Sequence, residues 1–226
     1  DEPRGRLSMD GDFDLLPEAL SGYACAHTTP ADPFLQALER DTYVNVLCPR
    51  MISGSYQGKL LEMLCRMIRP LRVLEVGTYT GYSALCMAKA LPEGGRITTI
   101  EHNLELEERL VRTFARAQAT PKIELLMGEA ARILPDLPGE TFDFVFLDAD
   151  KVNYERYYPL LKGLLKPGGW LLVDNVLWNG KVYDASCHDK DTLSVRALNR
   201  SIHEDPEVEN LLLPVRDGLM LVRKKN

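Results

Sequence analysis

Hydrophobic residues change their spacing once along the chain, near residue 72. Before that point the pattern is mostly helical and broken by turn residues, which predicts helices over residues 17–23, 33–43 and 56–68. Asp32-Pro33 is a typical start signal for the second helix, and Pro70 follows the end of the third. This first part of the chain therefore reads as a helical segment.

After residue 72, short apolar runs alternate with longer amphipathic segments. The runs predict strands over residues 73–76, 96–101, 123–127, 142–147 and 170–173. The segments between and after them predict helices over residues 83–91, 106–119, 131–137, 154–165 and 192–203. Lys166-Pro167-Gly168-Gly169 is expected to end one of these helices, and residues 177–191 form a turn-rich loop.

Two further strands, residues 208–213 and 219–223, close the chain as a hairpin around Asp217-Gly218. Strands that alternate with helices predict an α/β fold, a mostly parallel sheet covered by helices on both faces. The hairpin adds an antiparallel strand and brings the sheet to seven strands. We expect one domain over residues 1–226, with residues 1–70 as a helical N-terminal elaboration and residues 71–226 as the core.

Composition narrows the class of protein. The 226 residues are 45% hydrophobic and 27% charged, and no apolar run approaches the roughly 18 residues of a membrane span. The five cysteines are an odd number without a CxxC pair, which is neither a disulfide framework nor a zinc ribbon. These features, with no basic-then-apolar leader, indicate a cytoplasmic protein.

The net charge of -6 argues against non-specific binding to nucleic acid or to an anionic membrane. It leaves room for local basic patches. Arg109, Arg112 and Arg116 are expected to form a solvated stripe on one helix, and Arg223-Lys224-Lys225 form a basic tail.

Ligands of open α/β sheets bind beyond the carboxyl ends of the strands, so the residues there are candidates for the site. The first strand is followed by a loop in which Gly77 and Gly81 allow a tight turn and close approach to a ligand. Glu75, just before the loop, is poorly suited to a pyrophosphate and better suited to a cationic ligand. The alternative is a plain glycine turn with Glu75 as a partnered charge.

The second strand ends at Glu101-His102. An acid at this point of a βαβ unit accepts hydrogen bonds from ribose hydroxyls, and the alternative is a helix-capping acid. His102 is expected to be exposed or to stack near an adenine. After the third strand, a backbone amide of Gly128-Glu129-Ala130 is placed to contact the adenine edge.

The fourth and fifth strands are followed by Asp148 and by Asp174-Asn175. Two carboxylates and an amide at one sheet edge are three hard oxygen ligands, which suit Mg²⁺ most closely and also Mn²⁺ or Ca²⁺. The alternative makes each aspartate a helix cap.

Lys151, three residues after Asp148, is expected to point into the same site. A cation nearby disfavours the ammonium form, which makes Lys151 a candidate general base. The alternative is a surface lysine paired with Asp150.

Four segments carry a family resemblance: residues 73–85 (VLEVGTYTGYSAL), 142–154 (FDFVFLDADKVNY), 166–182 (KPGGWLLVDNVLWNGKV) and 213–219 (LPVRDGL). They resemble the cation-dependent O-methyltransferases. This family includes the caffeoyl-CoA O-methyltransferases of plants, many bacterial relatives and, more distantly, catechol O-methyltransferase. The resemblance runs from about Met51 to the C-terminus. It implies the class I methyltransferase (Rossmann-like) fold, S-adenosylmethionine as methyl donor, and a homodimer.

The resemblance also implies roles for individual residues. Asp148, Asp174 and Asn175 become the metal ligands, Lys151 with Asp148 the catalytic residues, and Asn179 with Lys151 the contacts to the acceptor. The residues expected around the donor are Met51, Ser53, Glu75, Gly77, Thr78, Tyr82, Ser83, Glu101, His102, Gly128, Glu129, Ala130 and Asp148. Residues 51–56 (MISGSY) and the loop 183–191 differ from the plant pattern, and no N-terminal lysine matches the one that contacts plant substrates.

We expect a small hydroxylated aromatic acceptor, such as a catechol or another vicinal diol, whose two oxygens bind the metal while Lys151 accepts a proton. The loop 181–191 is expected to cover the acceptor and to be mobile without it, and the helices before Met51 to complete the pocket and part of the dimer contact. One alternative keeps the fold but methylates a hydroxylated uridine of tRNA, with the basic residues named above as phosphate contacts. Another is a non-catalytic module that only binds S-adenosylmethionine.

Overall fold

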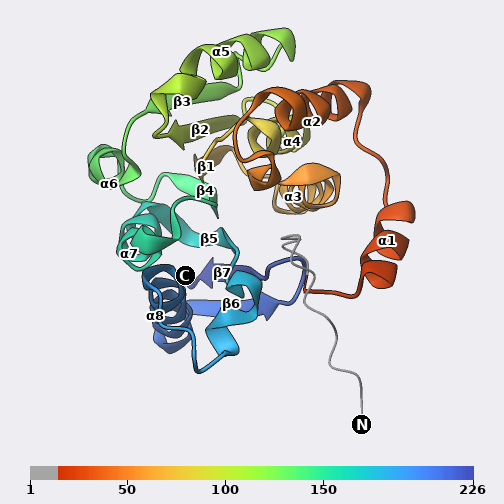
Figure 1. Ribbon diagram of the computed structural model, residues 1–226. Coiled ribbons are helices and arrows are strands. Elements are labelled where there is room, and N and C mark those ends of the chain that lie inside the picture. Colours follow the sequence, from red (N-terminus) through yellow and green to blue (C-terminus); the bar gives the residue numbers. More distant parts are fainter. Residues whose placement is uncertain (1–14) are drawn as a thin grey trace.

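The computed structural model describes residues 15–226, which form a seven-stranded sheet in the order β3-β2-β1-β4-β5-β7-β6 (Figure 1). The strands are β1 (Arg72–Val76), β2 (Arg96–Glu101), β3 (Ile123–Met127), β4 (Phe142–Leu147), β5 (Leu165–Asp174), β6 (Val208–Leu213) and β7 (Leu219–Lys224). The first five run parallel, and β7 is antiparallel to both β5 and β6. The predicted mostly parallel sheet with a closing hairpin is confirmed. Residues 1–14 of the predicted N-terminal elaboration lie outside the described residues.

Helices connect and cover the strands. The α-helices are α1 (Glu18–Ala26), α2 (Pro33–Asn45), α3 (Gly54–Ile68), α4 (Tyr82–Ala90), α5 (Glu107–Arg116), α6 (Ala130–Ile133), α7 (Tyr154–Leu164) and α8 (Lys190–Glu204). Short 3₁₀ segments are η1 (Pro49–Met51), η2 (Leu104–Leu106), η3 (Leu134–Asp136), η4 (Lys151–Asn153) and η5 (Trp178–Tyr183).

The sheet separates two hydrophobic cores, because side chains alternate between its faces along each strand. Val73 packs into one core with residues of α2, α3, α4 and α5, whereas the next residue, Leu74, packs into the other with residues of α6, α7 and α8. In Figure 1, α2, α3 and α4 lie on one side of the strands and α6, α7 and α8 on the other. This is the two-sided cover that continuous apolar strands require.

Three predicted elements differ in detail from the observed ones. β5 begins at Leu165, directly after α7, so Lys166-Pro167-Gly168-Gly169 is part of an irregular strand and not a separate turn. The register of β5 on β4 shifts between Phe142 and Phe144, and Gly168 has a φ of 76°. The helix predicted over residues 131–137 is four α-helical residues followed by η3, because a proline inside η3 has no amide hydrogen to continue the ladder. The loop predicted over residues 177–191 contains η5.

None of the helices in residues 15–226 is both long and apolar enough to cross a membrane. An open hollow of about 520 Å³ lies at the amino edge of the sheet, lined by residues such as Arg69, Lys166 and Trp170. The predicted site residues lie at the opposite, carboxyl edge, so this hollow is not the candidate site.

The contact between α3 and α4 gives a first prediction. Gly58 of α3 leaves space for two buried side chains of α4, because a Cβ there would lie 2.7 Å from both Tyr82 Cε1 and Cys86 Sγ. Gly58→Ala should lower the free energy of unfolding by about 1–3 kcal/mol from overpacking, more than the gain of about 1 kcal/mol in helix propensity. Gly22→Ala in α1 is the matched control, since a Cβ there meets nothing within 4 Å. Urea unfolding of both variants checks this; equal stability of the two would contradict it.

Candidate functional site

The site begins where the carboxyl ends of β1 and β4 meet, next to the point where the strand order reverses. The amide of Asp148 donates to the carbonyl of Val76 at 2.9 Å. Gly77 has a φ of 100°, and a Cβ on it would lie 2.0 Å from the carbonyl oxygen of Asp148. Only glycine fits there, so Gly77 lets the two loops approach each other.

Glu75 points into the interior and is fully buried. Ser83 Oγ donates to its Oε1 at 2.5 Å, and Thr99 Oγ1 donates to its Oε2 at 2.6 Å. Thr78 Oγ1 lies 2.6 Å from Thr99 Oγ1, which extends the network. Burial raises the pKa of Glu75 to about 8, and the charges of Asp148 and Glu101 add to the rise. Glu75 is thus a hydrogen-bonded carboxyl group that ties α4 to β2, and its predicted contact with the donor stays a prediction.

Glu101 joins the loops that follow the first two strands. Its Oε2 accepts the amide of Tyr79 at 2.8 Å, and its Oε1 accepts the amide of Asn103 at 2.8 Å. The side chain is 5% exposed, whereas His102 is exposed with Nδ1 3.3 Å from Glu101 Oε1. The carboxylate is therefore fixed by backbone donors at the edge of the sheet.

The third loop lies next to Glu101. The amide of Gly128, whose φ is 140°, donates to the carbonyl of Glu101 at 2.8 Å. Ala130 is buried at the start of α6, while Glu129 is exposed and pairs with Arg132 at 3.0 Å.

The remaining predicted donor residues fall in different environments. Met51 is exposed at the end of η1, and Ser53 is buried at the start of α3. Thr78 belongs to the buried network of Glu75. Tyr82 differs, because its ring packs against α3 in the core and its hydroxyl has no partner among residues 15–226.

Acidic residues gather where β4, β5 and the turn before β7 meet. Asp174 is 4% exposed, and its two carboxylate oxygens accept Gln57 Nε2 at 2.6 Å and the amide of Asn175 at 2.7 Å. Asp217 is 1% exposed and accepts Asn175 Nδ2 at 3.2 Å. Burial first, and the charge of Asp148 second, raise the pKa of Asp174 to about 6. Burial likewise raises the pKa of Asp217 to about 6.

Two basic residues offset this negative charge. Lys151 Nζ donates to Asp148 Oδ1 at 2.9 Å and to the hydroxyl of Tyr154 at 2.6 Å. Lys151 therefore pairs with Asp148 and not with Asp150, whose carboxylate accepts the hydroxyl of Tyr157. Arg216 Nη1 donates to the carbonyl of Ser53 and to Gln57 Oε1, both at 2.5 Å.

The three predicted metal ligands fit a hard divalent cation in their chemistry. The side-chain nitrogen of Asn175 donates a hydrogen bond to Asp217, which leaves the side-chain oxygen of Asn175 as a candidate ligand. Asp148 uses one carboxylate oxygen for Lys151 and is 20% exposed, and Asp174 has a pKa raised by burial and, second, by the charge of Asp148. Within residues 15–226, no group of three or more His, Cys, Asp or Glu side chains is arranged to hold a metal ion. The predicted ligands do not form such a group, because one of the three is the side-chain amide of Asn175 and the other two are carboxylates.

Four residues of this cluster escaped the sequence analysis. Gln57 donates to Asp174, and Arg216 in turn donates to Gln57. Tyr154 accepts from Lys151 and donates to the carbonyl of Asp174 at 3.1 Å. Asp217 was interpreted only as part of a hairpin turn. Tyr154, Arg216 and Asp217 had a local signal, since each lies inside one of the quoted family segments, whereas Gln57 had none.

The segment after β5 makes several hydrogen bonds to α8 that its polar sequence did not indicate. Arg196 of α8 donates to the carbonyls of Lys181, Val182, Asp184 and Cys187 at 2.5–2.8 Å. Asn199 Nδ2 donates to the carbonyl of Val176 at 2.8 Å. Asn179 is exposed with a φ of 52°, and its amide donates to Asp217 Oδ1 at 2.5 Å. Residues 181–187 are thus hydrogen-bonded to α8 and Asn179 to Asp217, and mobility of the loop 181–191 without acceptor stays a prediction.

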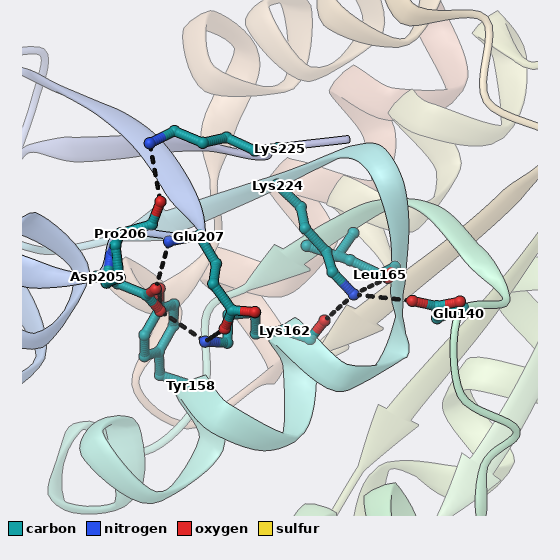
Figure 2. Close-up of polar contacts among 9 residues, drawn as sticks. All are labelled: Glu140, Tyr158, Lys162, Leu165, Asp205, Pro206, Glu207, Lys224 and Lys225. Carbon is teal, nitrogen blue, oxygen red and sulfur yellow. Dashed lines mark hydrogen bonds and ion pairs between the residues drawn. The ribbon is translucent and has the colours of Figure 1, made fainter.

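The basic residues considered as phosphate contacts are engaged within the chain. Arg109 pairs with Asp41, Arg112 with Glu108 at 3.2 Å, and Arg116 lies over the ring of Phe34. Figure 2 shows Lys224 contacting Glu140 and Lys225 donating to the carbonyl of Pro206. The Arg112 pair lies within α5, whereas the other contacts join different segments, so each of these basic side chains in the described part of the chain has a partner.

Comparisons with known proteins agree with this architecture. The profile of the O-methyltransferase family matches residues 25–225. A probable caffeoyl-CoA O-methyltransferase 2 of Dictyostelium discoideum is 32% identical over 213 residues, 92% of each chain. Catechol O-methyltransferase domain-containing protein 1 of Mus musculus is 42% identical over 172 residues, 74% of this chain and 66% of that one. The O-methyltransferase from Bacillus cereus in complex with SAH is 28% identical with a TM-score of 0.84, covering 92% and 97%.

The charges around Asp174 give a prediction with a defined pH dependence. Because its pKa is raised from 3.8 to about 6, this carboxyl's contribution to stability is present below about pH 4 and is lost as pH rises through 6. Lys151 lowers that pKa, so its charge stabilises the fold only where Asp174 is ionised. In chelator, Lys151→Met should lose about 1 kcal/mol more unfolding free energy at pH 7.5 than at pH 5.

Lys166→Met is the control. Its partner Asp143 has a lowered pKa and is ionised at both pH values, so the loss should be the same at each. Urea unfolding measures both variants; a loss for Lys151→Met that does not change with pH contradicts this account of the cluster.

Proposed function

The chain belongs to the O-methyltransferase family, as an S-adenosylmethionine-dependent enzyme, and we propose that it methylates one hydroxyl of a vicinal diol held by a divalent cation. The acceptor class is a small hydroxylated aromatic molecule, such as a catechol. The observation that carries the proposal is the convergence of Asp148, Asp174 and Asn175 beside Lys151 at one sheet edge. Mg²⁺ is the cation best suited to such oxygen ligands, with Mn²⁺ or Ca²⁺ as alternatives.

We propose that the donor binds along the carboxyl ends of β1, β2 and β3. Glu101 is held by backbone amides, with lone pairs left to accept from the ribose hydroxyls. Gly77 keeps the loop after β1 close to Asp148, and Glu75 acts from the interior by fixing Ser83 and, through Thr99, Thr78. Gly128, Glu129 and Ala130 follow β3 and border the adenine in this arrangement.

The chemistry needs an acceptor oxygen that is deprotonated and aligned with the methyl group. A bound divalent cation supplies Lewis-acid stabilisation of the oxyanion. Lys151 in its neutral form accepts the hydroxyl proton at Nζ, and Asp148 and Tyr154 hold that nitrogen in place. The acceptor oxygen then takes the methyl group from the sulfonium. Much of the rate comes from holding the reactants in line.

The segment after β5 is the proposed acceptor wall. Asn179 and η5 follow Asp174 and Asn175 directly, so they border the space next to the proposed cation. The four carbonyl contacts of Arg196 give this wall a defined shape, which favours selection among substituents on the diol. The caffeoyl-CoA and catechol names of the relatives fit this class of acceptor.

A homodimer stays a prediction of the family resemblance. Exposed apolar side chains of α1, α2 and the segment after α2, among them Tyr23, Val44 and Leu47, are surfaces that such an interface would cover. Methylation of tRNA is not proposed, because the basic residues on which it rested are paired within the chain.

The donor assignment gives a binding prediction. Glu101→Ala should weaken binding of S-adenosylhomocysteine by roughly 1–3 kcal/mol, since ribose hydroxyls and the amides of Tyr79 and Asn103 lose their acceptor. Calorimetry measures the affinity, with Glu105→Gln as an exposed control expected to match the wild type. An unchanged affinity for Glu101→Ala would remove Glu101 from the ribose site.

The cation proposal is tested by turnover of matched acceptors. Chelator should abolish methylation of a catechol, and added Mg²⁺ or Mn²⁺ should restore it. A phenol of equal bulk should react at least about tenfold more slowly, because one isolated hydroxyl cannot be aligned by two-point binding. Methyl transfer from labelled donor measures both rates. Equal rates for phenol and catechol, or full activity after exhaustive chelation, would overturn the proposed mechanism while leaving the fold and donor intact.

A further inference from the structure

We propose that Asp217 is a positioning residue: its carboxylate sets the orientation of the Asn175 side-chain amide, so that the carbonyl oxygen and not the NH₂ group faces the cation. The inference rests on the proposed function, because it concerns how one proposed ligand is prepared for the cation. It assigns a role to a residue that binds neither donor, cation nor acceptor itself.

The first support is the hydrogen bonding of Asp217. Its Oδ2 accepts Asn175 Nδ2 at 3.2 Å, and its Oδ1 accepts the amide of Asn179 at 2.5 Å. Both groups that face Asp217 are N–H donors, and the one that Asn175 presents is its NH₂ group. The carbonyl oxygen of the same planar amide then points away from Asp217.

The second support is that Asp217 has no freedom to turn away. Asp217 is 1% exposed. The turn that carries it is hydrogen-bonded through its backbone to the segment after β5. Leu177 donates its amide to the carbonyl of Asp217 at 2.9 Å, and Val176 donates to the carbonyl of Gly218 at 3.2 Å. Gly218 has a φ of 84°, and a Cβ there would lie 2.9 Å from the amide nitrogen of Leu177. The two segments are therefore packed backbone to backbone.

The third support is the backbone of the segment that Asp217 contacts. Asn175, Trp178 and Asn179 have φ values of 60°, 47° and 52°, a conformation that costs free energy for residues other than glycine. Such a conformation persists when surrounding contacts enforce it. Asp217 contributes one contact at each end of this segment, so it fixes the proposed cation ligand and the proposed acceptor residue together.

The substitution Asp217→Asn separates orientation from packing. The side chain keeps its size, and its carbonyl oxygen still accepts the close amide of Asn179. Its NH₂ group then faces the NH₂ group of Asn175, two donors with no acceptor between them. Asn175 is expected to relieve this by turning its amide over, which presents NH₂ in place of oxygen to the cation.

The test is binding of Mn²⁺ alone to the metal-free full chain, followed by calorimetry and by the paramagnetic resonance of the bound ion. Asp217→Asn should bind Mn²⁺ about 10–100-fold more weakly than the wild type, the usual effect of losing a residue that orients a metal ligand. S-adenosylhomocysteine affinity should not change, which shows that the sheet edge is intact. Asp136→Asn removes an exposed carboxylate elsewhere and should match the wild type.

A charge swap supplies the decisive variant. In Asn175→Asp with Asp217→Asn, the new amide donates to one oxygen of the new carboxylate and leaves the other oxygen for the cation, so Mn²⁺ affinity should return close to the wild-type value. This expectation stands even if Asp217→Asn alone fails to fold. If the wild type binds Mn²⁺ and either Asp217→Asn binds equally well or the swap stays weak, the positioning role is overturned. If the wild type binds no Mn²⁺, the proposed function fails first, and the inference fails with it.

Discussion

Two nearly fully buried carboxylates, Asp174 and Asp217, lie beside a third, Asp148, and the surroundings of the site are arranged to tolerate them. Burial without compensation disfavours the charged form, as their raised pKa values indicate. Donors reach the cluster from α3 through Gln57, from η4 through Lys151 and from the turn before β7 through Arg216. The need to compensate the negative charge of these carboxylates therefore holds together elements that are far apart in the chain. A bound cation would compensate that charge more fully.

The polar residues at the two halves of the carboxyl edge of the sheet are held in different ways. At the ends of β1 and β2, Glu75 is buried and accepts hydrogen bonds from two hydroxyl groups, and Glu101 accepts two backbone amides, so both acids connect neighbouring segments. At the end of β5, Asn175 and Asn179 adopt left-handed backbone conformations, and Asp217 accepts a hydrogen bond from each of them.

This difference bears on how such an enzyme changes its acceptor. Residues that hold the proposed cation are tied into the core, so their replacement costs stability as well as chemistry. The proposed acceptor wall is a turn whose backbone is held by Arg196 through four carbonyl groups. Under this proposal, changes to the side chains of the wall would alter selectivity while the oxygen ligands and Lys151 stay the same.

By itself, the sequence determined the sheet, the order of its elements and the residues at the strand ends, because each follows from local periodicity or from a short quoted segment. Asp148, Asp174, Asn175 and Lys151 were predicted to lie at one edge in this way, since parallel strands deliver their ends there. Only the tertiary structure decided that Gln57 supports Asp174 and that Arg216 supports Gln57, contacts between residues 117 and 159 positions apart. It also decided that Tyr82 packs in the core and that Asp217 orients toward Asn175 and Asn179. Local pattern fixes which face of an element a side chain takes, whereas its partner depends on which elements the folded chain brings together.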